Sequence, residues 1–180
     1  SVLIPADGRL NAPKGMCVVD NYLFVADVNS IVVFNLSDVS KSQKIKLPTK
    51  DSYVNDLAVN GKNLYATVTN TGNIYKLDVS SPENVKEQTP KLFANIPGAN
   101  GIIATDSIIY VASYPVDGNT SAPNVIYSIR NLENPITEVF LNRMSQYDGL
   151  ALSEDGKYLY FSTWVNGNVG KINIKDKKVE

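Results

Sequence analysis

A four-fold repeat is the feature of this sequence that most constrains its fold. Each copy begins with a polar residue followed by Gly or Asp, and a short apolar strand comes next. A tight turn then leads into a second apolar strand. The equivalent positions are Gly15, Asp56, Gly101 and Gly149, which are 41, 45 and 48 residues apart. This period suits one four-stranded blade of a β-propeller.

Short segments rich in β-branched and aromatic residues, separated by Gly, Asn, Asp and Pro, predict the strands of each blade. No long segment has the 3.6-residue apolar period of a helix, so we expect an all-β domain of antiparallel sheets. The predicted strands span 16–19, 22–26, 31–35 and 43–47; 54–59, 63–67, 73–79 and 91–94; 99–104, 108–112, 125–129 and 137–141; and 147–152, 158–162 and 169–174.

We interpret residues 1–180 as one propeller domain or fragment, with repeats at about 10–50, 51–95, 96–142 and 143–180. Residues 1–5 then form the outer strand of a preceding or closing blade, and Val179 begins the outer strand of the fourth repeat. Two architectures remain open: four blades of a larger propeller, with six blades favoured, or a closed four-bladed ring. An incomplete ring would expose two blade faces and favour self-association or another partner.

Composition excludes several classes of function. The 17 basic and 18 acidic residues are interspersed, which gives no basic patch for nucleic acid. The sequence contains no run of 18 apolar residues, so it predicts no membrane span. The apolar stretch at its start is too short for a signal peptide. We leave the compartment open, with an extracytoplasmic location favoured if the chain is a trimmed piece. The single cysteine, Cys17, lies in an apolar strand and is interpreted as a buried, unreactive thiol.

Catalysis by an activated nucleophile has little support in this chain. The sequence contains no histidine, so neither a Ser-His-Asp nor a Cys-His arrangement can form within it. It also lacks a Cys/His zinc cluster and a Gly-rich phosphate loop that opens a helix. Hydrolysis would therefore depend on a carboxylate and a metal ion.

Polar residues at the entrances to the first strands form the only convergent group that the sequence offers. The first strand of a blade is the innermost, so Lys14, Asn55, Asn100 and Asp148 should meet at one mouth of the central channel. Their amide and carboxylate oxygens suit a hard divalent cation, and Lys14 suits an anionic ligand. An insertion from 114 to 124 and a loop at 164–168 should lie on the same face, where Trp164 is either a sugar-stacking platform or a blade-packing residue.

Three of these entrances carry a family resemblance. Val54-Asn55-Asp56, Ala99-Asn100-Gly101-Ile102 and Tyr147-Asp148-Gly149-Leu150 resemble successive motifs of the gluconolactonase, regucalcin and senescence-marker family, which are six-bladed propellers that hydrolyse sugar lactones with a divalent metal. The resemblance implies that Asn100 and Asp148 bind a Ca, Mn, Zn or Mg ion, that Asp148 also acts as general base, and that Asn55 contacts the substrate.

The chain departs from that family at several positions. Tyr53 stands where the family has Arg, Leu57 replaces the Gly that follows Asn-Asp, and the metal-binding Glu of an earlier blade has no counterpart. The segments around Pro13-Lys14-Gly15-Met16 and Leu23-Phe24-Val25-Ala26-Asp27 resemble NHL repeats at least as well. The alternative function is therefore a noncatalytic NHL- or YWTD-like propeller that binds a peptide, glycan or protein.

Many of the candidate site residues also have a purely structural interpretation. Asn55, Asn100 and Asp148 can simply shape the turns into the inner strands by accepting a backbone N–H. Asp27, Asn29 and Asn70 are interpreted as turn residues. The tyrosines that recur with the repeat are predicted to form the core between blades; they are Tyr65, Tyr75, Tyr110, Tyr127, Tyr158 and Tyr160.

Overall fold

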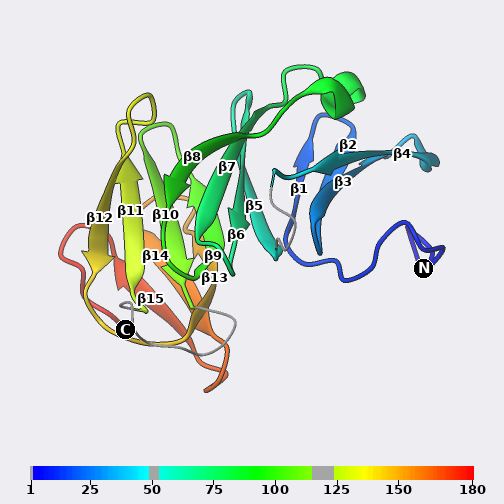
Figure 1. The fold of residues 1–180 in the computed structure, drawn as a ribbon. Helices are drawn as coiled ribbons and strands as arrows, with labels where there is room; N and C mark the ends of the chain where they lie inside the picture. The colour runs from blue at the N-terminus through cyan, green and yellow to red at the C-terminus, as the bar shows by residue number, and fades with distance from the viewer. Residues whose placement is uncertain (1, 49–52, 115–123) are drawn as a thin grey trace.

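The computed structural model describes residues 2–48, 53–114 and 124–180 and confirms the all-β architecture. Within these ranges the chain forms four antiparallel sheets, which fan around a common axis in sequence order (Figure 1). We call the sheets blades 1 to 4. In each blade the first strand is the innermost, and the inner strands β1, β5, β9 and β13 contact one another in that order.

The strands in each blade follow the chain from the axis outward. Blade 1 contains β1 (Met16–Val19), β2 (Tyr22–Asp27), β3 (Ser30–Asn35) and β4 (Asp38–Lys46); blade 2 contains β5 (Val54–Asn60), β6 (Asn63–Val68), β7 (Asn73–Asp78) and β8 (Lys91–Asn95); blade 3 contains β9 (Ala99–Ala104), β10 (Ile108–Ser113), β11 (Ile126–Arg130) and β12 (Ile136–Leu141); blade 4 contains β13 (Tyr147–Leu152), β14 (Tyr158–Thr163) and β15 (Val169–Asn173). A short 3₁₀ segment, η1 (Pro82–Glu87), precedes β8 and contacts β4. The described residues contain no helix with the length and apolar character that a membrane crossing requires.

The apolar core lies between the blades, because successive side chains of a strand point to opposite faces of its sheet. One cluster joins Phe24 of blade 1 to Leu57 and Leu64 of blade 2. A second joins blade 2 to blade 3, and a third joins blade 3 to blade 4. The repeat therefore folds as predicted, and adjacent blades bury their facing sides against one another.

The ends of the chain differ in part from the sequence interpretation. Residues 2–4, which we expected to form a strand, do not form one in the structure, and Val2 and Leu3 are 80% and 59% exposed. The outer strand of blade 4 is represented by a bridge between Ile172 and Val179, supported by two hydrogen bonds between the backbones of Lys171 and Glu180. Val179 thus pairs with β15 at the position where the sequence predicts that a fourth strand begins.

Residues 2–14, here called the N-terminal strap, run along the open face of blade 1. Ile4 and Leu10 pack against a cluster formed by Val25, Val32 and Phe34. The strap takes this course because the cluster is apolar and no other blade covers it within the described chain.

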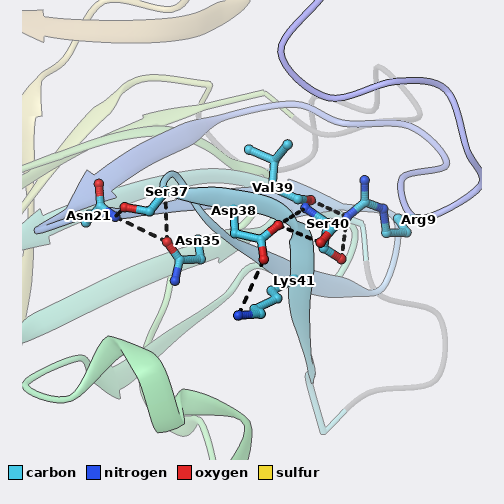
Figure 2. A network of polar contacts seen from close by, with 8 residues as sticks. All are labelled: Arg9, Asn21, Asn35, Ser37, Asp38, Val39, Ser40 and Lys41. Atoms are coloured by element: carbon cyan, nitrogen blue, oxygen red, sulfur yellow. Dashed lines mark hydrogen bonds and ion pairs between the residues drawn. The ribbon is translucent and has the colours of Figure 1, made fainter.

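Polar contacts fasten the strap to the edge of blade 1. Arg9 forms an ion pair with Asp7 and lies 5.0 Å from the centre of the Phe34 ring. It also donates to the carbonyl oxygens of Val39 and Ser40 in β4 (Figure 2). The start of β4 is itself ordered by Asp38, whose carboxylate accepts hydrogen bonds from Ser40.

Candidate functional site

A pocket of about 490 Å³ lies where the inner strands converge. All five residues predicted for the site contribute to its lining, namely Lys14, Asn55, Asn100, Asp148 and Trp164. The structure therefore brings together residues from all four blades, although they are up to 150 positions apart in the sequence. The remaining lining residues are Gly15, Tyr53, Asp56, Thr69, Gly101, Tyr114 and Gly149.

A β-bulge at each of three inner strands positions the polar side chains. In blades 2, 3 and 4, two residues of the inner strand stand opposite one residue of its neighbour. A bulge of this kind bends the strand and changes the direction of its side chains, and such bulges are common beside functional sites. The paired bulge residues are Asn55–Asp56, Asn100–Gly101 and Asp148–Gly149.

Glycine at the bulges allows adjacent inner strands to approach closely. A Cβ atom on Gly101 would overlap the Asp148 carbonyl oxygen and would lie 2.9 Å from Gly149 Cα. Any larger residue at position 101 would therefore force blades 3 and 4 apart. The Asn-Gly step thus has a steric role in addition to any role in ligand binding.

Two threonine hydroxyls connect blade 2 to blade 3 beneath the pocket. Thr67 Oγ1 donates to the carbonyl oxygen of Asn100 at 2.6 Å, and Thr69 Oγ1 donates to that of Ala99 at 2.8 Å. The Asn55 amide donates in turn to Thr69 Oγ1 at 2.9 Å, which fixes its orientation at the pocket wall. Neither threonine was predicted as a site residue, because Thr67 in β6 and Thr69 in the turn after it carry no sequence signal of this cross-blade contact.

The side chains of Asp148 and Asn100 both line the pocket and form a hydrogen bond with each other. Burial raises the pKa of Asp148 above its ordinary value, and a hydrogen bond with the Asn100 side chain partly opposes that shift. A carboxylate with a raised pKa retains a proton more readily than a solvated one and is correspondingly a stronger base. The pair places an amide and a proton-accepting group side by side.

Asp56 is a pocket residue whose side chain the sequence analysis did not assign. Its Oδ2 accepts the Ile102 N–H of the next blade at 3.0 Å, and its Oδ1 accepts the Leu57 N–H at 2.8 Å. Burial raises the pKa of Asp56; the two N–H donors lower it, and the nearby Asp148 charge raises it further. Oδ2 therefore links blade 2 to blade 3, while Oδ1 accepts from the next residue of its own strand, so Asp56 serves as a structural carboxylate in this pocket.

Cys17 lies behind this carboxylate on β1 and is half-buried. Burial raises the pKa of the Cys17 thiol to about 12, and the Asp56 charge contributes in the same direction. The thiolate form that reacts with electrophiles is therefore scarce at neutral pH, as expected for an unreactive thiol, although Cys17 is half-buried and not buried as predicted.

Lys14 supplies positive charge to the pocket. Its Nζ lies 4.2 Å from the centre of the Tyr53 ring and donates to the Ala12 carbonyl oxygen at 3.0 Å. Burial lowers the pKa of Lys14, and the Asp27 charge partly restores it. Tyr53 stands where the resembled family has Arg. Its ring contacts the Lys14 ammonium group, whereas an Arg at this position would itself carry the positive charge.

Trp164 forms an exposed aromatic wall at the opposite side. Its side chain is 71% exposed, so it does not pack between blades, while its backbone N–H donates to the Gln146 carbonyl oxygen at 2.9 Å. In the part of the chain that the structure describes, Asn124 Oδ1 and Gln146 Oε1 are buried without a hydrogen-bond partner. The predicted lid at 114–124 falls almost entirely on residues 115–123, which lie outside the described part of the chain.

The donor set limits what kind of metal ion the pocket can hold. In the described part of the chain, no group of three or more His, Cys, Asp or Glu side chains is arranged to bind a metal. Asn100 and Asp148 provide one amide and one carboxylate, which fits a hydrated hard cation that keeps several of its waters. The residues present therefore fit a Ca²⁺- or Mg²⁺-type ion better than a closed transition-metal site.

Comparison with known structures identifies the fold. A virginiamycin B lyase from Staphylococcus aureus superposes with a TM-score of 0.72 at 17% identity, over 98% of this chain and 57% of the lyase. The fold is that of a β-propeller. A catalytically inactive histidine-to-alanine variant of the lyase with quinupristin matches with a TM-score of 0.68 at 18% identity, over 94% of this chain and 54% of that one.

The designed protein Ika4 also matches, with a TM-score of 0.62 at 11% identity over 97% of this chain and 98% of Ika4. No family model and no curated protein matches the sequence. The chain spans little more than half the length of the lyase, and identities below a quarter relate the folds alone.

Proposed function

We propose that the channel-mouth pocket binds a small polar, ring-shaped molecule of the sugar-lactone type and hydrolyses it, with Asp148 as the general base. The observation that carries this proposal is the convergence of Lys14, Asn55, Asn100, Asp148 and Trp164 from four blades on one pocket of about 490 Å³. That volume falls within the range of small-molecule sites, roughly 300–1,000 Å³.

Each part of the pocket has a chemical use in this proposal. The exposed Trp164 ring offers an apolar face on which a sugar ring can stack, while Asn55 and Asn100 can hydrogen-bond ring hydroxyl groups. Lys14 can offset the negative charge of the carboxylate that lactone opening produces.

The reaction requires a base to accept a proton from water as that water adds to the lactone carbonyl. The protonated base then returns the proton to the ring oxygen as the ring C–O bond breaks, which gives a hydroxy acid whose carboxyl group ionises in solution. Asp148 fits this role because burial raises its pKa, which increases the basicity of the carboxylate. A divalent cation held by Asn100 and Asp148 would supply Lewis acidity when bound.

The first experiment is a hydrolysis assay with a panel of sugar lactones, with and without Ca²⁺, Mn²⁺, Zn²⁺ or Mg²⁺. Hydrolysis that disappears in Asp148→Asn, while the variant keeps its fold by circular dichroism, supports the proposal. A chain that neither hydrolyses any lactone nor binds any lactone or cation by calorimetry contradicts it.

The exposure of the aromatic wall favours a second candidate function, noncatalytic binding of a peptide, glycan or protein. Trp164 and its neighbour Val165 are 71% and 61% exposed, as is typical of a contact surface for a macromolecule. In this case Trp164→Ala weakens partner binding, whereas Asp148→Asn leaves it nearly unchanged. The opposite pattern favours the enzyme.

A further inference from the structure

The second strand of every blade carries an aromatic ring at the same register position. These residues pair across the sheet with Cys17, Ala58, Ile103 and Ala151 of the inner strands, and they are Phe24, Tyr65, Tyr110 and Tyr160. The first three are 0%, 1% and 4% exposed, but Tyr160 is 40% exposed. Tyr160 therefore departs from our prediction that it is part of the core between blades.

The difference arises from what lies next to each ring. Phe24 packs into the cluster that joins blade 1 to blade 2, Tyr65 into the one that joins blade 2 to blade 3, and Tyr110 into the one that joins blade 3 to blade 4. Tyr160 belongs to the last sheet, and the described chain places no further blade against it. Within residues 2–48, 53–114 and 124–180 this side of blade 4 is uncovered, and we call it the Tyr160 face.

On the other side of each junction, equivalent residues of the inner strand contact the preceding blade. In blades 2 and 3, the inner-strand residues Leu57 and Ile102 receive the preceding blade and are 5% and 3% exposed. The residue at the same register position in blade 1 is Met16, which is 58% exposed, and Val18 beside it is 51% exposed. The described chain therefore leaves this side of blade 1 uncovered near the axis, and we call it the Met16–Val18 face.

The N-terminal strap covers only part of the receiving side of blade 1. Ile4 and Leu10 cover Val25, Val32 and Phe34, which are 2%, 2% and 0% exposed. Met16 and Val18, nearer the axis, remain open. The exposed area is therefore the inner part of the junction, where adjacent inner strands meet in the rest of the molecule.

A lysine beside Tyr160 is compatible with a closed junction. Lys171 pairs with Tyr160 across the sheet, just as Lys76 pairs with Tyr65 in blade 2. Lys76 lies about 6 Å from the Tyr65 and Phe93 ring centres at a junction that is fully formed. Lys171 has its charge balanced by Glu180 at 2.9 Å, so its presence does not prevent a blade from packing there.

We propose that the Tyr160 face of one copy of this chain packs against the Met16–Val18 face of a second copy, which repeats the interblade junction between molecules. A second copy is the occupant because the chain itself carries the matching half of the junction, in the same register as its three internal junctions. The two faces differ, so the contact is head-to-tail and forms either a closed ring or an open chain of copies. The inference does not depend on the proposed function.

The test uses sedimentation velocity on the wild-type chain and on Tyr160→Lys and Val18→Lys, at concentrations up to the solubility limit. The wild type is expected to self-associate, and each variant should weaken association by about 30-fold or more, as a hot-spot substitution does. A mixture of the two variants should form a heterodimer, because each supplies the face that the other lacks. Leu92→Lys is the matched control, since Leu92 is an exposed apolar residue on the outer strand β8.

Three results would overturn the proposal. A wild-type chain that stays monomeric shows that these faces accept another partner or none. Single variants that associate as strongly as the wild type place the contact elsewhere, and a mixture that remains monomeric excludes the head-to-tail arrangement. Because both substituted side chains are exposed, circular dichroism should show an unchanged fold, and a variant that fails this check is replaced by Tyr160→Ser or Val18→Ser.

Discussion

The Asp56 carboxylate occupies the space that Gly15 leaves open between blades 1 and 2. A Cβ atom on Gly15 would overlap Asp56 Oδ1 and would lie 2.6 Å from Asp56 Cα. The Gly15 N–H donates to the Asn55 carbonyl oxygen at 2.8 Å, while the Asp56 side chain extends to the Ile102 N–H of blade 3. One carboxylate therefore links three successive blades at the wall of the pocket.

Gly15→Ala should be strongly destabilising, because the overlap includes backbone atoms that a rotation of the Asp56 side chain cannot relieve. We expect a loss of about 3 kcal/mol in the free energy of unfolding, the upper end of the usual cost of overpacking. Urea denaturation followed by circular dichroism measures this difference.

Gly149→Ala provides the comparison for that substitution. Its Cβ would meet only the Ser162 hydroxyl, at 3.2 Å, and a side-chain hydroxyl can move more easily than backbone. We expect a loss of roughly 1 kcal/mol, at the low end of the same range. Equal losses for the two variants would show that the close approach at Gly15 does not limit the packing of the blades.

The equivalent tyrosines predict unequal costs for the same substitution. Tyr65→Ala removes a ring that is 1% exposed between blades 2 and 3 and should cost about 3–5 kcal/mol in unfolding free energy. Tyr160→Ala removes a ring that is 40% exposed and should cost about 1 kcal/mol in the monomer. Denaturation at low protein concentration measures both values. A large cost for Tyr160→Ala under those conditions would mean that its ring is already packed within the monomer.

The sequence was sufficient to predict the blades and the place of the pocket, because both follow from repetition. Four copies of one unit place equivalent positions at equivalent radii, so Lys14, Asn55, Asn100 and Asp148 had to meet near the axis if the units fanned around it. The strand predictions also agree with the structure to within one or two residues, with two exceptions: β4 begins at Asp38 and not near Gln43, and the strand predicted at residues 2–4 does not form.

The bulges explain why the role of Asp56 could not be predicted from the sequence. A regular strand places neighbouring residues on opposite faces, which gives no reason for both Asn55 and Asp56 to line one pocket. The irregular pairing between Val54 and Leu57 removes that alternation. Asp27 was likewise read as a turn residue, although it is fully buried and binds a segment about 15 residues earlier in the chain.

Asp27 should make the stability of the strap depend on pH. Its carboxylate accepts hydrogen bonds from the backbone N–H groups of Asn11 and Ala12 and from the Asn11 amide. Burial alone would raise the pKa of Asp27, but these donors outweigh it and hold the pKa below the ordinary value of 3.8. The stabilisation is therefore complete above pH 3.8 and is lost as the pH falls through the lowered folded-state pKa.

Asp27→Asn should accordingly cost about 1–3 kcal/mol near neutral pH, because the amide NH₂ cannot accept from the strap. The difference from wild type should shrink as the pH falls below 3.8, which urea denaturation across that range would reveal. Asp106→Asn, at an exposed turn, controls for the loss of a charge. A difference that stays constant with pH would show that the Asp27 carboxylate is not the titrating group.

Cation binding at the pocket should strengthen as the pH rises, because the proton on Asp148 competes with the metal. Burial raises the pKa of Asp148 above 3.8, so affinity should begin to fall at a higher pH than an ordinary aspartate would cause. Calorimetric titration with Ca²⁺ between about pH 4 and 8 would measure this dependence. Asp148→Asn should abolish it, whereas Asp155→Asn should leave it intact because Asp155 lies in an exposed turn with a pKa of about 2. Binding that is equally tight in Asp148→Asn and wild type would assign the cation to other residues.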